Sequence, residues 1–222
     1  MDMEKDRWRS LSAASLSDAL DRLGIAGQCL GIKPLDPRFR LIGHAFTVRY
    51  GPVGSTHGTV GDYIDEVAPG QVVVLDNGGR LDATVWGDIL TEVSHQRALA
   101  GTVIHGVCRD VARSLELSYP IFSRGAYMRT GKDRVQAEAF NTAVSLGDVR
   151  VEPGDLVFGD ADGVLVVPRS REAQVLELAI EIEAREQQIR AAIATGARLE
   201  EARRAAGYHE LQRRTDEHKT RR

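Results

Sequence analysis

The fold is decided by residues 72–79, VVVLDNGG, and residues 101–110, GTVIHGVCRD. Each stretch opens with an apolar run, typical of a strand buried on both faces, and continues into glycine and polar residues. Helices are expected to follow over residues 88–99 and 110–117, with a third strand at residues 120–122. Strands and helices that alternate at this spacing predict parallel βαβ units and therefore an α/β fold.

The flanking sequence adds elements on both sides of this α/β centre. A helix over residues 10–23 and a strand over residues 46–50, ended by Gly51-Pro52, are expected before it. Four short runs separated by turn residues predict a β-meander after it: residues 143–146, 149–151, 156–158 and 164–167. A long amphipathic helix is predicted over residues 169–194, and a second helical piece over residues 199–206.

Length and composition limit the class of protein. A chain of 222 residues is typical of one domain with an appendage, here a main domain over residues 1–168 and a helical extension with a basic tail over residues 169–222. The net charge of −3 gives no reason to expect binding to nucleic acid or membranes. Neither a signal peptide nor a membrane span is recognisable. With Cys29 and Cys108 expected as free thiols, a cytoplasmic location is predicted.

Polar residues gather where two strands pass into helices. Asp76-Asn77-Gly78-Gly79 and Gly87-Asp88-Ile89-Leu90 follow the first strand, and His105 to Asp110 follow the second. In open α/β sheets, ligands bind beyond the carboxyl ends of the strands, so both clusters are expected at one edge.

Each cluster has a structural and a functional interpretation. Asp88 and Asp110 could simply be N-cap residues, each adding about 1 kcal/mol of stability. Alternatively, the free N–H groups at residues 87–90 could hold a carboxylate or phosphate. Asp110 could then be an oxygen ligand for Mg²⁺ or Mn²⁺, and Arg109 a forked donor to the oxygens of a keto acid. Two junctions on one edge favour the functional interpretation.

Asp88, twenty intervening residues and Arg109-Asp110 resemble the signature of the class II pyruvate aldolases. These enzymes act on 4-hydroxy-4-methyl-2-oxoglutarate or 4-carboxy-4-hydroxy-2-oxoadipate, and share their fold with the regulator of ribonuclease activity A. The resemblance covers most of the chain and continues through six motifs: Ser17-Asp18-Ala19-Leu20, residues 69–76, residues 101–110, residues 120–125, Pro153-Gly154-Asp155 and residues 159–164.

The resemblance implies a swivelling β/β/α sandwich of the RraA-like kind, assembled as a homotrimer or a dimer of trimers. It implies that the backbone amides of Gly87, Asp88, Ile89 and Leu90 hold the carboxylate of a small 2-keto acid, with Arg109 on the pyruvyl oxygen. Asp110 would bind the divalent metal directly. Asp88 would reach the metal through water and act as the base.

The implied activity is metal-dependent carbon–carbon cleavage that releases pyruvate, with oxaloacetate decarboxylation as a second activity. The alternative is a non-catalytic regulator that binds a ribonuclease or another protein. In the resemblance, such regulators carry Gln where this chain has Asp110, which favours the enzyme. No Lys lies close in sequence to either junction, so a Schiff-base aldolase is disfavoured.

Other residues receive more cautious interpretations. His105 and Asn77 depart from the family pattern and are expected to flank the pocket. Glu183 or Glu186 of a neighbouring subunit could complete the site. Structural or surface roles are expected for the remaining candidates: His44, His57, His95, Asp160, Asp162 and Cys108. Trp86 could wall the pocket or pack in the core.

Overall fold

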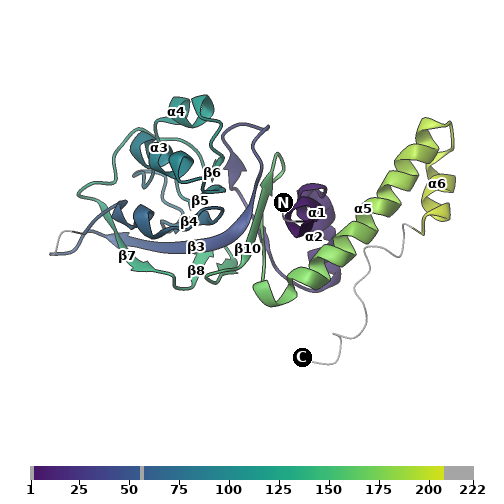
Figure 1. Cartoon of the computed structure of the whole chain (residues 1–222), viewed down its shortest axis with the longest axis horizontal. Coiled ribbons are helices and arrows are strands. Elements are labelled where there is room, and N and C mark those ends of the chain that lie inside the picture. Colours follow the sequence, from purple (N-terminus) through teal and green to yellow (C-terminus); the bar gives the residue numbers. More distant parts are fainter. Residues whose placement is uncertain (1–2, 56–57, 208–222) are drawn as a thin grey trace. The chain divides into compact units, whose positions relative to one another are not determined.

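The computed structural model describes residues 3–55 and 58–207. The chain divides into two compact units, which we call the sheet unit, Gln28–Arg169, and the helical unit, Met1–Gly27 with Ser170–Arg222 (Figure 1). The predicted division into domains at residue 168 stays a prediction, because compact units do not show which segments fold independently.

One mixed sheet organises the sheet unit. In the described part of the chain its order is β1-β11-β10-β3-β4-β5-β6-β2, and β7 also pairs with β3. The strands are Gln28–Cys29 (β1), Lys33–Pro34 (β2), Leu41–Pro52 (β3), Val72–Asp76 (β4), Gly101–His105 (β5), Ile121–Ser123 (β6), Val135–Phe140 (β7), Leu156–Asp160 (β10) and Gly163–Val167 (β11). Strands β3 to β6 pair in parallel, which confirms the predicted βαβ units.

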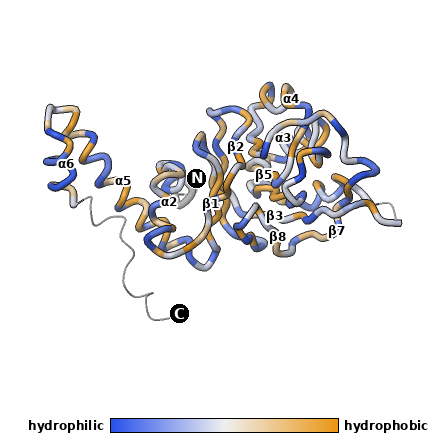
Figure 2. Tube along the Cα trace, turned by 180° about the vertical axis from the view of Figure 1, so that it is seen from behind, coloured by the Kyte–Doolittle hydropathy of each residue, from blue (hydrophilic) through white to orange (hydrophobic). Residues whose placement is uncertain are grey.

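Alternate residues of the parallel strands face two separate cores. Val72 and Val74 pack in the first core with the hairpin β8 (Val144–Leu146) and β9 (Val149–Val151). Val73 and Leu75 pack in the second core, on the face covered by η1 (Asp62–Glu66), α3 (Asp88–Gln96) and α4 (Val111–Glu116). Apolar residues accordingly gather along the strands (Figure 2). The layers are β/β/α, as the family resemblance implied.

Strand β3 is longer than predicted and shared by several partners. It runs over Leu41–Pro52 rather than residues 46–50. Its first half pairs antiparallel with β10, and its second half pairs antiparallel with β7 after a register shift between Arg49 and Tyr50. Pro52 did not end the strand early, because it pairs with Val135 at the end of the β7 ladder, where a missing N–H is tolerated. Strand β7 itself was not predicted.

The predicted β-meander is wrong in its connectivity. Strands β8 and β9 form a two-stranded sheet of their own, whereas β10 and β11 join the main sheet. The separation occurs at the turn after β9, where Gly154 has a φ of +86°. The Gly154 N–H donates to the Ala45 carbonyl at 2.9 Å, and the Ala45 N–H donates to the Asp155 carbonyl at 2.8 Å. These bonds direct β10 along β3 instead of β9.

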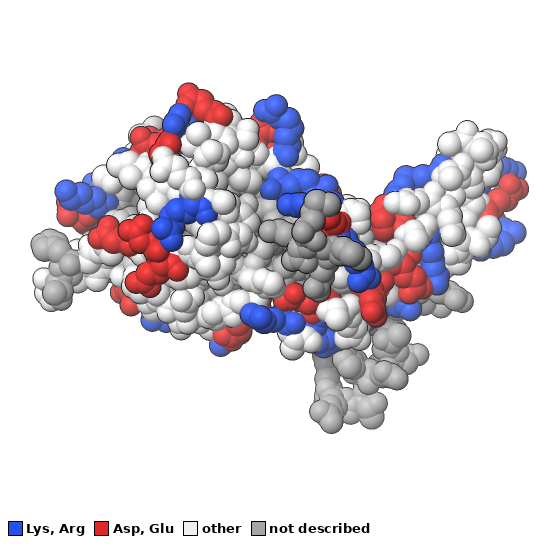
Figure 3. All heavy atoms as spheres, in the orientation of Figure 1, with Lys and Arg blue, Asp and Glu red and all other residues white. Residues whose placement is uncertain are grey.

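The helical unit contains α1 (Met3–Arg9), α2 (Ala13–Arg22), α5 (Glu172–Ala194) and α6 (Leu199–Ala205). A capping box between Ser12 and Ser15 starts α2, three residues later than predicted, and α1 was not predicted. Acidic and basic side chains alternate along α5 (Figure 3), with ion pairs such as Arg185–Glu181. No described helix could cross a membrane. The expected solvated tail, residues 213–222, lies outside the described residues.

Substitution of Gly43 by Ala tests the contact between β3 and the turn before β4. A Cβ at this position would lie 2.4 Å from the backbone oxygen of Gly70, which cannot move independently. Gly43→Ala is expected to lower the free energy of unfolding by about 1–3 kcal/mol, measured by urea titration. In the control, Gly54→Ala, the nearest neighbour of the new Cβ is the side-chain amide nitrogen of Gln136 at 3.8 Å. Equal destabilisation by the two variants would contradict the prediction.

Candidate active site

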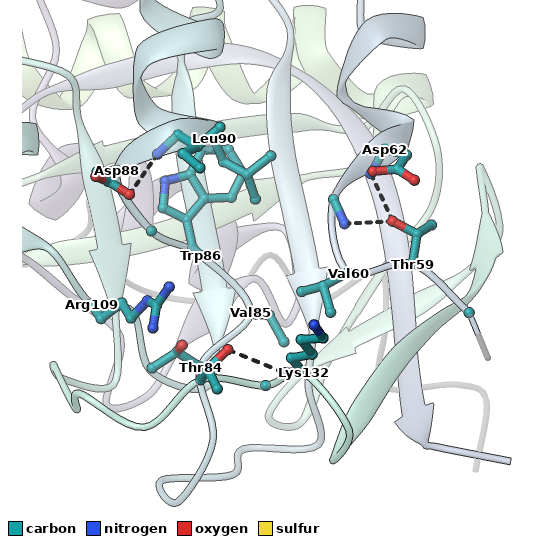
Figure 4. A pocket seen from close by; sticks show the side chains of 16 residues that line it. Thr59, Val60, Asp62, Thr84, Val85, Trp86, Asp88, Leu90, Arg109 and Lys132 are labelled. Carbon is teal, nitrogen blue, oxygen red and sulfur yellow. Dashed lines mark hydrogen bonds between the residues drawn. The ribbon is translucent and has the colours of Figure 1, made fainter.

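A pocket of about 410 Å³ lies beyond the carboxyl ends of the parallel strands (Figure 4). Its walls come from residues 58–62 after β3, residues 84–90 after β4, Arg109 after β5 and residues 130–132 after β6. The volume is within the range of about 300–1,000 Å³ typical of small-molecule sites. The position agrees with the edge expected from the sequence.

Backbone hydrogen bonds hold these wall segments side by side after the strands have ended. The Arg109 N–H donates to the Trp86 carbonyl at 3.0 Å, and the Thr84 N–H donates to the Arg129 carbonyl at 3.0 Å. Thr84 also forms isolated parallel bridges to Val107 and Thr130. The wall segments therefore follow the same order as the strands of the sheet, and their backbones are held together by hydrogen bonds.

Trp86 both packs in the core and forms part of the pocket wall. Its side chain is only 2% exposed, and it stacks on Tyr119 with the ring planes 3° apart and the centroids 6.3 Å apart. Trp86 also lines the pocket, and its indole N–H donates to Thr91 Oγ1 at 2.9 Å. This bond ties the pocket wall to the first turn of α3.

The start of α3 directs its N–H groups toward carboxylates. Gly87 is the N-cap and Asp88 the first helical residue, so the interpretation of Asp88 as an N-cap is wrong. The Asp88 N–H donates to Asp110 Oδ2 at 3.2 Å, and the Ile89 N–H donates to Asp88 Oδ1 at 2.9 Å. Two of the amides predicted to bind substrate thus already bind carboxylate oxygens of the chain itself.

Asp110 has an unusual backbone and an unusual partner. It occupies the N-cap position of α4 with a left-handed φ of +57°, yet its side chain caps no N–H of that helix. Its Oδ2 instead accepts from the Asp88 N–H and lies 3.3 Å from Arg109 Nε. Left-handed geometry at a residue other than Gly is costly, and it turns this carboxylate away from α4. Asp110 is therefore the N-cap residue of α4 by position, as the structural interpretation expected, but its side chain does not act as a cap.

Gly87 is required for this approach. A Cβ on Gly87 would lie 2.8 Å from Asp110 Oδ2 and 3.3 Å from Arg109 Nε. Absence of a side chain lets the segment after β5 come against the start of α3. The glycine therefore joins the two predicted clusters.

The structure brings the predicted site residues together. Gly87, Asp88, Ile89, Leu90 and Arg109 line one pocket, and the Asp110 carboxylate lies beside them. Their individual roles stay predictions, since geometry alone does not assign them.

One lysine lies near the site, although none is close in sequence to either junction. Lys132 lines the pocket, because the loop after β6 folds back over Thr84. Thr59, from the segment before η1, and Asp62, the first residue of η1, also line the pocket and were not predicted. These residues lie outside the two βα junctions, so the spacing of polar residues at the junctions could not predict them.

The donors present suit magnesium better than most other metals. Among residues 3–55 and 58–207, no group of three or more His, Cys, Asp and Glu side chains could hold a metal ion. Asp110 and Asp88 offer hard oxygen atoms, and the Asp110 side chain is 39% exposed and unused in capping. Mg²⁺ commonly uses one or two protein carboxylates and completes its shell with waters and substrate. The residues present are compatible with such a site.

His105 and Asn77 do not line the pocket. His105 Nδ1 lies 3.4 Å from Asp76 Oδ1, and the Asn77 side-chain amide donates to the Ala83 carbonyl at 3.1 Å. Asp76 also accepts from the N–H groups of Gly78 and Ser145, both at 3.0 Å. Burial would raise the pKa of Asp76, but these hydrogen bonds outweigh it and lower the pKa below 3.8. The cluster supports the loop that leads to the pocket.

Most of the remaining interpretations are confirmed. Cys108 is fully buried, and burial raises the pKa of its thiol. His95 is exposed, and the Asp162 N–H donates to Asp160 Oδ1 at 2.9 Å in a turn. His44 lies half-buried on β3, whereas His57 lies outside the described residues.

The two acidic residues proposed from α5 both contact one arginine of that helix. Arg190 Nη2 lies 2.5 Å from Glu183 Oε1, and Arg190 Nη1 lies 3.2 Å from Glu186 Oε2. Completion of a neighbouring site by either glutamate stays a prediction.

Fold and pocket together define an α/β protein with a cavity of small-molecule size at the carboxyl ends of its parallel strands. A family model described as RraA-like, Aldolase/RraA, matches residues 13–166, and the chain belongs to this family.

Three similar proteins illustrate the range of the family. Protein DlpA of Legionella pneumophila is 42% identical over 195 residues, which make up 86% of this chain and 32% of DlpA. The chain thus spans about a third of that relative's length. A protein of Halalkalibacterium halodurans, provisionally named a 4-hydroxy-4-methyl-2-oxoglutarate aldolase, is 34% identical over 78% of this chain and 80% of its own.

The third is a solved structure, RraAS2 of Streptomyces coelicolor, described as an unusual member of the RNase ES inhibitor RraA protein family. It has a TM-score of 0.78 and 29% identity, and the match covers 84% of this chain and 96% of RraAS2. The family therefore includes proteins named for catalysis and proteins named for inhibition.

Replacement of Asp76 by Asn tests the cluster that supports the pocket loop. Because folding lowers the pKa of Asp76, its ionised form stabilises the protein above the unfolded value of 3.8. This contribution is lost as pH falls through the folded-state pKa. Asp76→Asn is expected to lower the free energy of unfolding by about 1–3 kcal/mol at neutral pH, and by less in acid. The free energy of unfolding is measured by urea titration at a series of pH values from neutral down through the folded-state pKa of Asp76.

The control is Asp82→Asn, which removes an exposed ion pair with Arg80 in the same loop. Little change is expected, because exposed pairs contribute little. A stability gap between wild type and Asp76→Asn that stays constant with pH would contradict the assignment.

Proposed function

We propose that this chain is a divalent-metal-dependent lyase that cleaves a 4-hydroxy-2-keto acid and releases pyruvate. One observation carries the proposal: Asp88, Arg109 and Asp110 converge at a single pocket through the close approach that Gly87 permits. Membership of the RraA-like family and a relative provisionally named as an aldolase support it.

The first turn of α3 binds the substrate's carboxylate in this proposal. Its N–H groups lie at the positive end of the helix dipole, where anions are stabilised. The hydrogen bond from the Asp88 N–H to Asp110 Oδ2 supports this role, since it already pairs that N–H with a carboxylate. An incoming substrate carboxylate would replace the Asp110 oxygen there.

Arg109 stabilises the charge that develops during cleavage. As the C3–C4 bond breaks, its electron pair passes into the C2–C3 bond and negative charge collects on the 2-keto oxygen. The Arg109 guanidinium faces the pocket, and only an ion pair with Asp110 at 3.3 Å engages it among the described residues. A divalent cation held by Asp110, with Asp88 reaching it through water, would supply further Lewis-acid stabilisation of the same charge.

Asp88 is the proposed base. Its carboxylate takes the proton of the 4-hydroxyl through a bridging water, so that a carbonyl forms at C4 as the bond to C3 breaks. The enolate then gains a proton at C3 and leaves as pyruvate. Oxaloacetate would give the same enolate on loss of carbon dioxide, which accounts for the proposed second activity.

The assembly is proposed to be a homotrimer or a dimer of trimers, with Glu183 or Glu186 of a neighbouring subunit near the site. The alternative, a regulator that binds a ribonuclease, has support from the description of RraAS2. The Asp88–Arg109–Asp110 arrangement favours the enzyme, because it places two carboxylates and an arginine together at a pocket of small-molecule size.

Substitution of Asp110 tests the function directly. Chelator-treated protein is expected to release pyruvate from oxaloacetate only after Mg²⁺ or Mn²⁺ is added back. Asp110→Asn should lose most of this activity and also bind Mn²⁺ more weakly in calorimetry, since it lacks the anionic ligand. Activity that ignores the metal or survives in Asp110→Asn would refute the mechanism. Asp82→Asn, which alters a carboxylate outside the pocket lining, is the matched control.

Arg109→Lys separates stabilisation of the enolate from simple charge. Lysine keeps the positive charge but lacks the forked donor. A decrease of about 10²–10³ in kcat for pyruvate release is expected, which is the usual cost of losing one oriented donor. Full activity in Arg109→Lys would exclude the proposed role.

A further inference from the structure

A second positively charged side chain lines the pocket, and the proposed mechanism does not use it. Lys132 lines the wall formed after β6, and its side chain is exposed. Figure 4 shows its ammonium group near Val60, with Arg109 on the other side of Val85. Within the part of the chain that the structure describes, no carboxylate forms an ion pair with Lys132. The pocket therefore presents positive charge at two separate places.

The backbone of Lys132 is fixed even though its side chain is exposed. A Cβ on the preceding Gly131 would lie 2.2 Å from the Thr84 carbonyl oxygen, so the loop packs directly on the wall after β4. The N–H groups of Arg134 and Val135 both donate to the Gly131 carbonyl at 2.9 Å. The Lys132 N–H also lies 3.2 Å from Thr130 Oγ1. The backbone of Lys132 is thus held at a defined wall of the pocket, and its flexible side chain extends from there.

On the basis of the proposed function, we propose that Lys132 binds the second carboxylate of a 2-keto dicarboxylate substrate. The α3 N–H groups and Arg109 occupy the side of the pocket that takes the pyruvyl half. The other half of a 4-hydroxy-2-keto acid must then extend toward the opposite wall, where Lys132 lies. Val60, Val85 and Leu90 also line the pocket and provide apolar surface for the carbon chain of such a substrate.

Two acidic residues also line the pocket. Asp88 belongs to the start of α3, and Asp62 lies with Thr59 on the side away from Arg109 (Figure 4), without an ion pair to Lys132 among the described residues. A Schiff-base role for Lys132 is less suitable, because imine-forming lysines are activated by burial in an apolar site. The exposed Lys132 lacks that environment.

The test compares two substrates that share a pyruvyl half. 4-Hydroxy-2-oxoglutarate carries the second carboxylate, and 4-hydroxy-2-oxopentanoate has a methyl group in its place. Lys132→Met is expected to lower the ratio of kcat/KM for the diacid over the monoacid by about 10- to 100-fold, the usual effect of one charged hydrogen bond. Any general loss of activity cancels in this ratio. Lys132→Arg should retain most of the preference.

The control is Lys33→Met, which removes a lysine of β2 outside the pocket lining and should leave the ratio unchanged. A wild-type enzyme without preference for the diacid, or equal losses for both substrates in Lys132→Met, would overturn the assignment. Trapping of Lys132 on pyruvate by borohydride would also overturn it.

A binding measurement separates this proposal from the lyase itself. Calorimetry in the presence of Mg²⁺ compares 2-oxoglutarate with 2-oxobutyrate, neither of which can be cleaved as a 4-hydroxy acid. Weaker binding of 2-oxoglutarate alone to Lys132→Met would support the assignment even if wild-type protein cleaves no substrate, in which case only the proposed reaction fails. If wild type binds neither acid, both proposals fail.

Discussion

The parallel ladder between β4 and β5 is the constraint on which the pocket depends. Asp76 pairs with His105 at its end, so both strands finish at the same level of the sheet. Because residues on both faces are buried in separate cores, a slip of one residue would turn every side chain to the wrong core. The register is therefore well determined, and so is the place where the chain leaves the sheet.

Beyond that edge, small residues and carboxylates set the geometry. Gly87 permits contact between two loops, and Gly131 permits contact with a third. Asp110 adopts a left-handed backbone that a capping role would not require. Strain of this kind is kept where surrounding structure determines it, and it is concentrated at functional sites. The site is thus built from backbone approach as much as from side chains.

The sequence predicted well what depends on local patterns. Continuous apolar runs identified β4 and β5, and the polar residues expected to meet at one sheet edge, Asp88, Arg109 and Asp110, do lie together there. The long strand β3 was only partly predicted, because its pairing changes from β10 to β7 along its length. Lys132 could not be predicted from either junction, since its position depends on the packing of Gly131 against Thr84, distant in sequence. Contacts between residues that are distant in sequence produce no periodic pattern in the sequence from which they could be predicted.

If the start of α3 binds a carboxylate as proposed, the hydrogen bond between the Asp88 N–H and Asp110 Oδ2 inhibits that binding by competition. The chain supplies its own anion to the helix terminus, so a ligand carboxylate must compete with it and binds with reduced apparent affinity. Any partner that draws the Asp110 carboxylate away removes this competitor. Occupancy of the helix terminus and occupancy of Asp110 are then linked, and linkage is reciprocal, so each event strengthens the other by the same factor.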